Sequence, residues 1–147
     1  MQKNNTVIRK AVASDAGEIH RLTQELEQTS VPVEIFTEVF FTNLGNKSIF
    51  YFVSEENGVI TGFVSLHIQV LLHHWGRVAE IQELVVHPGF RNRETGKRLL
   101  ETAVQTARDQ HCELIELAAN IRREKAHAFY LKNGFFKTHF KFTFALK

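Results

Sequence analysis

Apolar side chains recur at helical spacing or on one side in three stretches of the chain, which predicts three helices, and a fourth helix is predicted before a helix stop at Asn133-Gly134. The clearest stretch runs from Thr95 to about Gln110, and its buried stripe is Leu99, Leu100, Ala103, Val104 and Ala107. Asp15 followed by Glu18 is typical of a capping box, and Asn133-Gly134 is typical of a helix stop. The pattern predicts helices over residues 15–28, 33–44, 95–110 and 125–132.

Between these stretches lie shorter β-prone runs, and the last of them alternates aromatic with polar residues. Glu56-Asn57-Gly58 is typical of a hairpin turn between two of the strands. The predicted strands span residues 7–10, 49–54, 59–73, 78–86, 114–118 and 135–146. The order β-α-α-β-β-β-α-β-α-β favours an α/β fold with a mixed, mostly antiparallel sheet and helices on both faces. With 147 residues and no linker, we expect one domain over residues 1–147.

Composition narrows the class of protein. The chain is 44% hydrophobic and 23% charged, as is typical of a soluble globular protein. Its first residues contain no apolar signal segment, and Ser65, His67 and Gln69 interrupt the one long apolar run. A lone cysteine, Cys112, excludes an internal disulfide framework and a cysteine-based zinc site. We therefore expect a cytoplasmic protein that does not act at a membrane.

A net charge of +2 conceals an uneven distribution. Residues 1–86 carry 6 Lys/Arg and 10 Asp/Glu, whereas residues 87–147 carry 12 Lys/Arg and 6 Asp/Glu. Arg91, Arg93 and Lys97 lie just before and inside the start of a predicted helix, where unpaired N–H groups favour phosphate. A phosphate-binding turn is one interpretation, and a solvated helix end is the other. No recognition-helix pattern appears, so we expect no nucleic-acid partner.

Two motifs in this basic half are more specific. The first is Val85-Val-His-Pro-Gly-Phe-Arg91 with Gly96-Lys97-x-Leu-Leu100 after it, and the second is Asn120 followed by Ala126-x-x-Phe129-Tyr130 and Gly134-Phe135. In sequence, order and spacing they resemble the acetyl-CoA signature of the Gcn5-related N-acetyltransferases, the GNAT family. One departure is Glu94, which stands where the family's loop has its first glycine.

Further segments resemble one subgroup of that family, the aminoalkylphosphonate N-acetyltransferases, which also lack the first loop glycine. These segments are Leu66–Gln69, Leu72–His74, Glu80–Val86, Ala126–Leu131 and His139–Thr143. The resemblance implies the GNAT fold and an enzyme that transfers the acetyl group of acetyl-CoA to the primary amine of a small molecule. It also implies the residues that contact the co-substrate: Leu84, Val85, Val86, Arg91, Asn92, Arg93, Glu94, Thr95, Gly96, Lys97, Asn120, Ala126 and Phe129.

Acetyl transfer needs a base for the amine and a donor for the departing thiolate. Glu80 is our candidate base, because a carboxylate within a strand is costly unless it is hydrogen-bonded or functional. Tyr130 is our candidate acid, because a phenol is neutral at pH 7 and can donate to sulfur. The alternatives are a glutamate on an open sheet face and a tyrosine packed in the core. Glu83 lies on the opposite face from Glu80 by period-2 counting, and we expect it to orient substrate.

Histidines supply the remaining candidates for substrate contact. His67 and His73 share one face of the predicted long strand, His74 begins the next turn, and His139 lies on the polar side of the last strand. As imidazolium they could bind a phosphonate, or with Glu80 they could hold a divalent metal ion. Two histidines are a weak metal signal, so we predict no metal site. The remaining interpretation is that they are ordinary polar strand residues.

Cys112 is distant in sequence from both motifs and has no evident basic partner, which favours direct transfer without an acyl-enzyme. The alternating phenylalanines at 140, 142 and 144 indicate core or a dimer interface, and we expect a homodimer. Rival interpretations are an acetyltransferase acting on a protein, peptide or polyamine amine, and a non-catalytic module that binds acyl-CoA.

Overall fold

The computed structural model describes residues 5–91 and 94–147. The chain divides into two compact units, Met1–Glu116 and Leu117–Lys147, each of which is described by itself. The elements are β1 (Thr6–Lys10), η1 (Ala13–Asp15), α1 (Ala16–Glu27), α2 (Val33–Leu44), β2 (Ile49–Glu56), β3 (Val59–Leu71), η2 (Leu72–His74), β4 (Gly76–Val86), η3 (Pro88–Phe90), α3 (Thr95–Asp109), β5 (Leu114–Leu117) and α4 (Glu124–Lys132). All four predicted helices are present, and the first five predicted strands are present.

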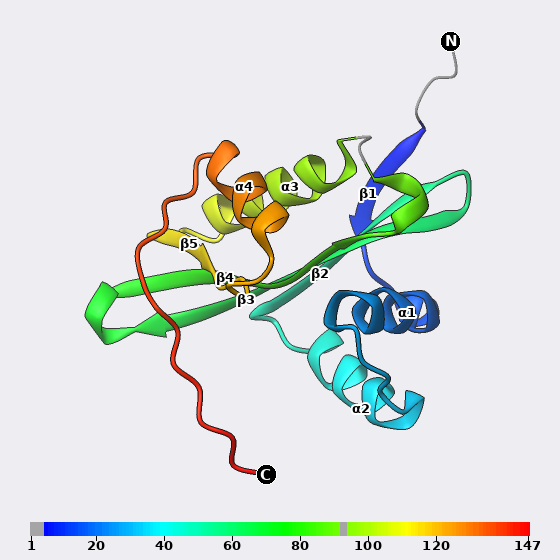
Figure 1. Ribbon diagram of the computed structural model, residues 1–147, viewed down its shortest axis with the longest axis horizontal. Helices are drawn as coiled ribbons and strands as arrows, with labels where there is room; N and C mark the ends of the chain where they lie inside the picture. The colour runs from blue at the N-terminus through cyan, green and yellow to red at the C-terminus, as the bar shows by residue number, and fades with distance from the viewer. Residues whose placement is uncertain (1–4, 92–93) are drawn as a thin grey trace. The chain divides into compact units, whose positions relative to one another are not determined.

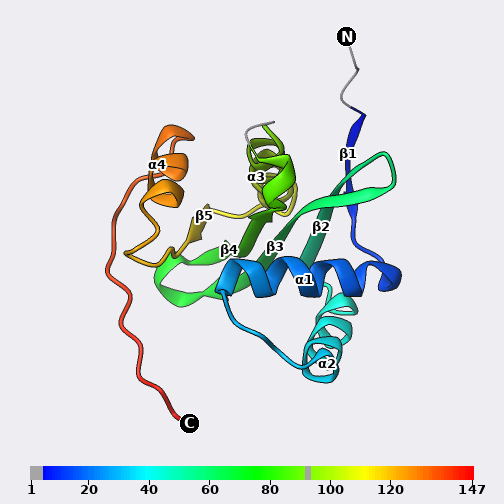
Figure 2. The ribbon, with the colours of Figure 1, turned by 45° about the vertical axis from the view of Figure 1, so that its right-hand side comes forward.

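The five strands form one sheet in the order β1-β2-β3-β4-β5, and the pairs from β1 to β4 are antiparallel. In the first unit, α1 and α2 cover one face of the sheet and α3 covers the other (Figures 1 and 2). The hairpin between β2 and β3 turns at Asn57 and Gly58, which have φ values of 52° and 79°. The predicted α/β fold with helices on both faces is therefore confirmed.

Each face has its own apolar contacts. Leu99 and Ala103 of α3 are fully buried against the sheet, as the helical stripe predicts. Gly62 of β3 allows this approach, because a Cβ there would lie 2.8 Å from the Leu99 side chain. On the other face, Ile19 and Leu22 of α1 join a cluster that includes Phe40, Val53, Phe63 and Val85. One face of β3 and β4 therefore packs against α3, and the opposite face packs against α1 and α2. The candidate site lies on the second of these faces.

The predicted last strand is wrong. Residues 135–147 adopt neither helix nor strand, and the side chains at 140, 142 and 144 are between 82% and 92% exposed. In Figure 1 this segment is the red trace that leaves α4 and runs to the C-terminus. A strand requires a neighbour for its backbone groups, and alternation in the sequence cannot supply one.

Asp15 does not cap α1 through its side chain, contrary to the capping-box expectation. Its carboxylate accepts a hydrogen bond from the Val12 N–H at 2.8 Å and pairs with both terminal nitrogens of Arg9 at 2.8 and 3.0 Å. The buried carboxylate therefore ties the end of β1 to the start of α1. The Arg9 guanidinium lowers the pKa of Asp15 below its usual value of 3.8, despite the opposing effect of burial.

No helix among residues 5–91 and 94–147 is long and apolar enough to cross a bilayer.

Substituting Asp15→Asn should lower the free energy of unfolding by about 2 kcal/mol at pH 7, because it removes charge-assisted hydrogen bonds from a buried site. A carboxyl whose pKa is lowered by folding stabilises the fold above its unfolded pKa and loses this effect as pH falls through its folded pKa. Urea unfolding of both proteins should thus show a difference that shrinks below about pH 4. A difference that is unchanged down to pH 2.5 would contradict this role of Asp15.

Candidate active site

A one-residue bulge in β4 determines which side chains meet in the first unit. Ser65 of β3 pairs with Glu83, whereas the next residue, Leu66, pairs with Ile81, so Gln82 has no partner on β3. His67 then pairs with Glu80. Because Ser65 and His67 are two residues apart on a regular strand, their side chains share a face, and so do those of their partners. The expectation that Glu83 lies opposite Glu80 is wrong, since the bulge breaks period-2 counting.

The face that carries both glutamates is the one covered by α1 and α2. Tyr51 of β2 pairs with Ser65, so Tyr51, Ser65 and Glu83 form one row across three strands. The Tyr51 ring stacks on Phe40 of α2, with centroids 5.6 Å apart. The next row along the strands consists of Ile49, His67 and Glu80. The polar rows therefore begin where the apolar cluster under the helices ends.

Neutral donors hold the two carboxylates. The Ser65 hydroxyl donates to the Glu83 carboxylate and accepts the Glu83 backbone N–H at 3.0 Å. The bulged residue, Gln82, donates its side-chain amide to Glu80 Oε1 at 2.7 Å. Within the part of the chain that the structure describes, neither carboxylate is ion-paired with Lys, Arg or His. Both are half-buried, so they offer an unneutralised negative site to a cationic ligand.

Tyr51 is a polar part of the same row that the sequence analysis missed. Its hydroxyl accepts a hydrogen bond from Asn43 of α2 at 2.8 Å, and burial raises the pKa of the phenol. The phenol therefore stays neutral at physiological pH and can donate a hydrogen bond of its own. Ser65, which was also missed, was detectable as the one hydroxyl in the apolar run Val64–Leu66.

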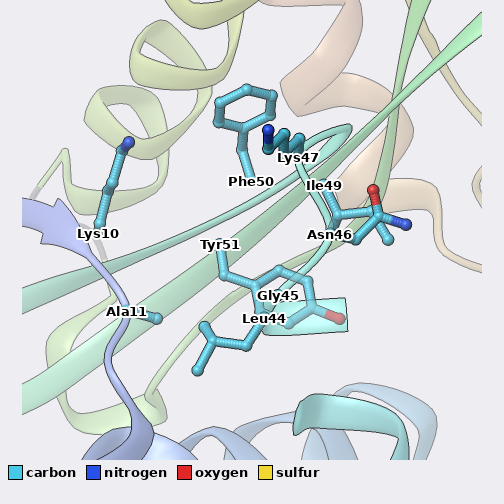
Figure 3. A pocket seen from close by; sticks show the side chains of 9 residues that line it. All are labelled: Lys10, Ala11, Leu44, Gly45, Asn46, Lys47, Ile49, Phe50 and Tyr51. Atoms are coloured by element: carbon cyan, nitrogen blue, oxygen red, sulfur yellow. The ribbon is translucent and has the colours of Figure 1, made fainter. Parts of the chain in front are cut away.

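Tyr51 also borders a hollow at the edge of the sheet, beyond the end of β1 (Figure 3). The turn between α2 and β2 forms one wall, and the Lys10 ammonium lies over the Phe50 ring at 5.9 Å. Its lining residues are Lys10, Ala11, Leu44, Gly45, Asn46, Lys47, Ile49, Phe50 and Tyr51. None of the residues selected from the sequence lines this hollow.

The predicted phosphate-binding turn follows β4. Leu84, Val85 and Val86 end the strand, and Thr95 begins the 15-residue helix α3. Among the described residues, the N-cap residue Glu94 makes no side-chain hydrogen bond to the start of α3, and the N–H groups of a first helical turn have no partner within the helix. Gly96 and the exposed Lys97 lie in that first turn. The predicted contacts Asn92 and Arg93 lie outside the described residues.

Two charged residues beside this turn have structural constraints of their own. Arg91 donates to the Val86 carbonyl at 3.2 Å and pairs with Glu25 of α1 at 3.3 Å. Glu94 occupies the N-cap position with φ 61°, a left-handed conformation that favours glycine. Glu94, which stands where the family's loop has a glycine, therefore has a strained backbone and an exposed negative charge.

The histidines are only partly brought together. His67 lies in the row with Glu80, but β3 ends at Leu71, and the predicted strand to residue 73 is too long. His73 and His74 instead form the 3-10 helix η2, with ring centroids 4.3 Å apart. No group of three or more His, Cys, Asp or Glu within residues 5–91 and 94–147 is arranged to hold a metal ion.

In the second unit, Tyr130 of α4 packs between two phenylalanines. Its ring meets those of Phe129 and Phe135 edge-on, at 5.3 and 5.7 Å, and burial raises the pKa of its phenol. A raised pKa keeps the hydroxyl protonated, as a proton donor requires.

The other predicted residues of this unit occupy the approach to α4 and the segment after it. Asn120 accepts the Arg122 N–H through its side-chain oxygen at 2.9 Å, and its carbonyl bonds to the His127 ring at 2.8 Å. Ala126 lies in the first half of α4. His139 lies in the segment without regular structure and contacts the Thr138 hydroxyl at 2.6 Å.

Cys112 follows α3 in the first unit. Burial raises the pKa of its thiol, although nearby Arg77 partly opposes the shift. Since the thiolate is the nucleophile, a thiol that holds its proton is a poor acyl acceptor.

Comparison with known proteins agrees with this architecture. The model of the acetyltransferase (GNAT) family matches residues 16–135. The aminoalkylphosphonate N-acetyltransferase of Salmonella typhimurium is 40% identical over 139 residues, which cover 95% of this chain and 90% of that protein.

Two solved structures have the same fold. A transcriptional regulator from Bacillus halodurans superimposes with a TM-score of 0.89 at 21% identity, covering 97% of this chain and all of that one. An aminoglycoside N-acetyltransferase in complex with CoA superimposes with a TM-score of 0.88 at 16% identity, covering 98% of this chain and 96% of that one.

The strain and charge of Glu94 can be separated by two variants. Glu94→Gly removes both, whereas Glu94→Gln removes only the charge. Relief of a left-handed non-glycine residue should raise the free energy of unfolding of Glu94→Gly by about 1 kcal/mol relative to Glu94→Gln. Both variants should bind acetyl-CoA roughly two- to fivefold more tightly, because a negative charge at a helix start repels phosphate.

Urea unfolding and isothermal titration calorimetry measure the two effects. Equal stability of Glu94→Gly and Glu94→Gln would contradict the strain at this residue. Unchanged acetyl-CoA affinity in both would argue against phosphate at this helix start.

Proposed function

The chain belongs to the GNAT acetyltransferase family, and from this premise we propose that it acetylates the primary amine of an aminoalkylphosphonate in the cytoplasm, as a homodimer. The observation that carries the choice of an amine substrate is the pair of carboxylates, Glu80 and Glu83, on one face without a cationic partner among the described residues. An alkylammonium ion supplies the missing positive charge. Identity to the Salmonella relative supports the phosphonate.

In this proposal the two glutamates have different tasks. Glu80 is the base, directly or through one water, since Gln82 is the one donor to its carboxylate among the described residues and a carboxylate has further lone pairs to accept a proton. Glu83 binds and orients the ammonium group, because the Ser65 hydroxyl and backbone pairing fix its position. An ammonium group that is held in a fixed position keeps the amine nitrogen close to the thioester carbonyl, which favours the reaction.

The anionic end of the substrate needs cationic or donor groups. His67 of β3 pairs with Glu80 of β4, so it lies directly beside the proposed base in the sheet. Its ring N–H would donate a hydrogen bond to the phosphonate. We assign His73, His74 and His139 to substrate contact on the resemblance alone.

Acetyl-CoA is the co-substrate. The first turn of α3, with Thr95, Gly96 and Lys97, fits a pyrophosphate, since it combines backbone N–H groups that Glu94 does not cap with a lysine. We assign Arg91, Asn92, Arg93 and the backbone N–H of Glu94 to the same phosphates. We assign Leu84–Val86 to the thioester arm, and Asn120, Ala126 and Phe129 to the rest of the CoA. The backbone N–H of Val85 is our candidate donor to the tetrahedral oxyanion.

Transfer is direct in this mechanism. The ammonium group loses one proton to Glu80, and the free amine attacks the thioester carbonyl to form a tetrahedral intermediate. As the intermediate collapses the C–S bond breaks, and the CoA thiolate takes a proton from Tyr130. The nitrogen then loses its second proton, through solvent, to the Tyr130 phenolate, which leaves the amide and restores the phenol. Burial of Tyr130 supports this role because it keeps the phenol protonated. The raised pKa of Cys112 supports a mechanism without an acyl-enzyme.

The test of the activity is acetyl-CoA-dependent release of CoA thiol with aminomethylphosphonate, 2-aminoethylphosphonate, a simple alkylamine and a polyamine. We expect kcat/KM to be highest for the phosphonates, with mass spectrometry showing an acetylated amine. Release with the polyamine alone would overturn the substrate class and leave the acetyltransferase. Absence of release with every amine would overturn the enzyme.

Substituting Tyr130→Phe should lower kcat at least 100-fold and leave the Kd for acetyl-CoA within about twofold, because it removes a proton donor and keeps the ring between Phe129 and Phe135. Steady-state kinetics and calorimetry measure the two constants. Phe135→Leu is a matched control in the same aromatic cluster that keeps the hydroxyl. Unchanged kcat in Tyr130→Phe would remove this residue from the chemistry.

Glu80→Gln and Glu83→Gln should separate the two carboxylates. Loss of the base should lower kcat by about 10²–10⁴-fold and remove the protein's own limb from the dependence of rate on pH, leaving only the ionisation of the amine. Loss of the orienting carboxylate should mainly raise KM for the amine and keep the shape of the profile. Exchanged effects would reverse the assignment, and normal kinetics in both variants would exclude this face as the amine site.

A further inference from the structure

Tyr51 is a polar side chain of the candidate site to which the proposed mechanism gives no task. Its ring contacts two other aromatic rings: it stacks on Phe40 of α2 with centroids 5.6 Å apart, and it meets Phe63 of β3 edge-on at 5.3 Å. Phe40 and Phe63 are both buried. A ring packed in this way has little freedom to move, so packing fixes the position of the Tyr51 hydroxyl.

Asn43 orients this hydroxyl. Its side-chain amide donates to the Tyr51 oxygen at 2.8 Å from the last turn of α2. A phenol that accepts one hydrogen bond still has its own O–H to donate, and the raised pKa of Tyr51 keeps that proton in place. Among residues 5–91 and 94–147, no acceptor is found for this O–H. Tyr51 therefore has a donor that remains for a ligand.

The strands around Tyr51 carry donors and carboxylates on separate sides of the site. Tyr51 of β2 pairs with Ser65 of β3, and His67 follows two residues later, so Tyr51 and His67 are diagonal neighbours on one face. Diagonal neighbours lie roughly 7–8 Å apart, within reach of aromatic side chains. Glu80 and Glu83 both belong to β4. The face therefore presents donors on β2 and β3 and negative charge on β4.

This arrangement matches a substrate that has an anion at one end and an amine at the other. Neighbouring strands lie about 4.8 Å apart, similar to the separation of nitrogen and phosphorus in 2-aminoethylphosphonate, where two carbons join them. With the ammonium group at Glu83, the phosphonate oxygens would lie over β3, between Tyr51 and His67. An alkyl group in that place would leave the half-buried Tyr51 O–H without an acceptor, and a site of this kind rejects such a ligand.

We propose that the Tyr51 hydroxyl donates a hydrogen bond to the phosphonate and so determines the preference for a phosphonate-bearing amine, with Asn43 as the positioning residue that orients the phenol. The inference rests on the proposed function and deepens it, because it names a residue by which the amine site selects its substrate class. The hydrogen bond is charge-assisted, since the ionised phosphonate is the acceptor, and no proton is transferred.

Tyr51→Phe removes the hydroxyl and keeps the ring against Phe40 and Phe63. Steady-state release of CoA thiol should show KM for 2-aminoethylphosphonate raised about 10- to 100-fold, the range of one hydrogen bond to a charged group, with little change in kcat. For propylamine, which has no anionic group, KM should not change. An unchanged KM for the phosphonate, or an equal rise for both amines, would overturn the role of Tyr51.

Asn43→Leu tests the positioning residue. It should raise KM for the phosphonate alone, by roughly two- to tenfold, because the phenol remains but loses the hydrogen bond that orients it. The double variant should be no worse than Tyr51→Phe, since both changes act on one hydrogen bond. The matched control is Thr42→Val, because the Thr42 hydroxyl donates to the Glu38 carbonyl of its own helix at 2.8 Å. Losses that multiply in the double variant, or an equal loss in Thr42→Val, would overturn the role of Asn43.

Tyrosine labelled with ¹³C at Cζ gives an NMR readout that needs no turnover. The chain has two tyrosines, so Tyr130→Phe identifies the signal of Tyr51. In the CoA complex this signal should move on addition of 2-aminoethylphosphonate and should move much less with propylamine. A signal that moves equally with both amines, or with neither, would overturn the inference.

The two measurements separate this inference from the proposed function. Acetylation of the phosphonate with the same constants in wild type and Tyr51→Phe would overturn the inference and keep the proposed function. A Tyr51 signal that responds to the phosphonate, in a protein that acetylates no amine, would support the inference and overturn the proposed function.

Discussion

Gln82 has no partner residue on β3, and this one extra residue in β4 decides which side chains share a face of the sheet. In a regular strand, residues three apart point to opposite faces. The bulge restores Glu80 and Glu83 to one face, beside His67 and Ser65. Its own side chain then holds the Glu80 carboxylate. A bulge thus supplies both the alignment and one of the hydrogen bonds of the candidate amine site.

The helices decide where this polar surface begins. Under α1 and α2 the face of the sheet is apolar. This apolar area ends at the row of Tyr51, Ser65 and Glu83. The Arg9–Asp15 pair helps to fix this cover, because it joins β1 to the start of α1. In our proposal the acidic first part of the chain supplies the carboxylates that bind the amine, and the basic turn that follows β4 supplies the phosphate contacts. The net charge is low because the acidic first part of the chain and the basic second part, which bind the amine and the phosphates in our proposal, nearly cancel.

Periodicity located the helices and most strands, because burial of one stripe or one face is written directly in the sequence. It failed where a single residue or a missing neighbour decides the outcome. Nothing in Glu80–Glu83 marks Gln82 as unpaired, so counting by two assigned Glu83 to the wrong face. The stripe at Phe140, Phe142 and Phe144 has the pattern of a strand, yet a strand also needs a partner.

Part of the candidate site was proposed from sequence motifs alone, and part became visible only in the structure. Motifs pointed to Glu80, Tyr130 and the turn before α3, since these residues lie in contiguous segments. Tyr51 and Ser65 were missed because they belong to the site only through strand pairing with Glu83, which register determines. Asp15 was assigned to a cap, whereas the neighbouring Arg9 offered it a stronger, charge-assisted contact.

The central claim is that the amine binds at the row of side chains beside the bulge, and not in the hollow of Figure 3 that Lys10 and Lys47 line. Titration of ¹⁵N-labelled protein, first with CoA and then with 2-aminoethylphosphonate, tests it directly by amide chemical shifts. We predict that the amine shifts Tyr51, Ser65, Glu80 and Glu83, and shifts confined to residues 44–50 and Lys10 would contradict the account.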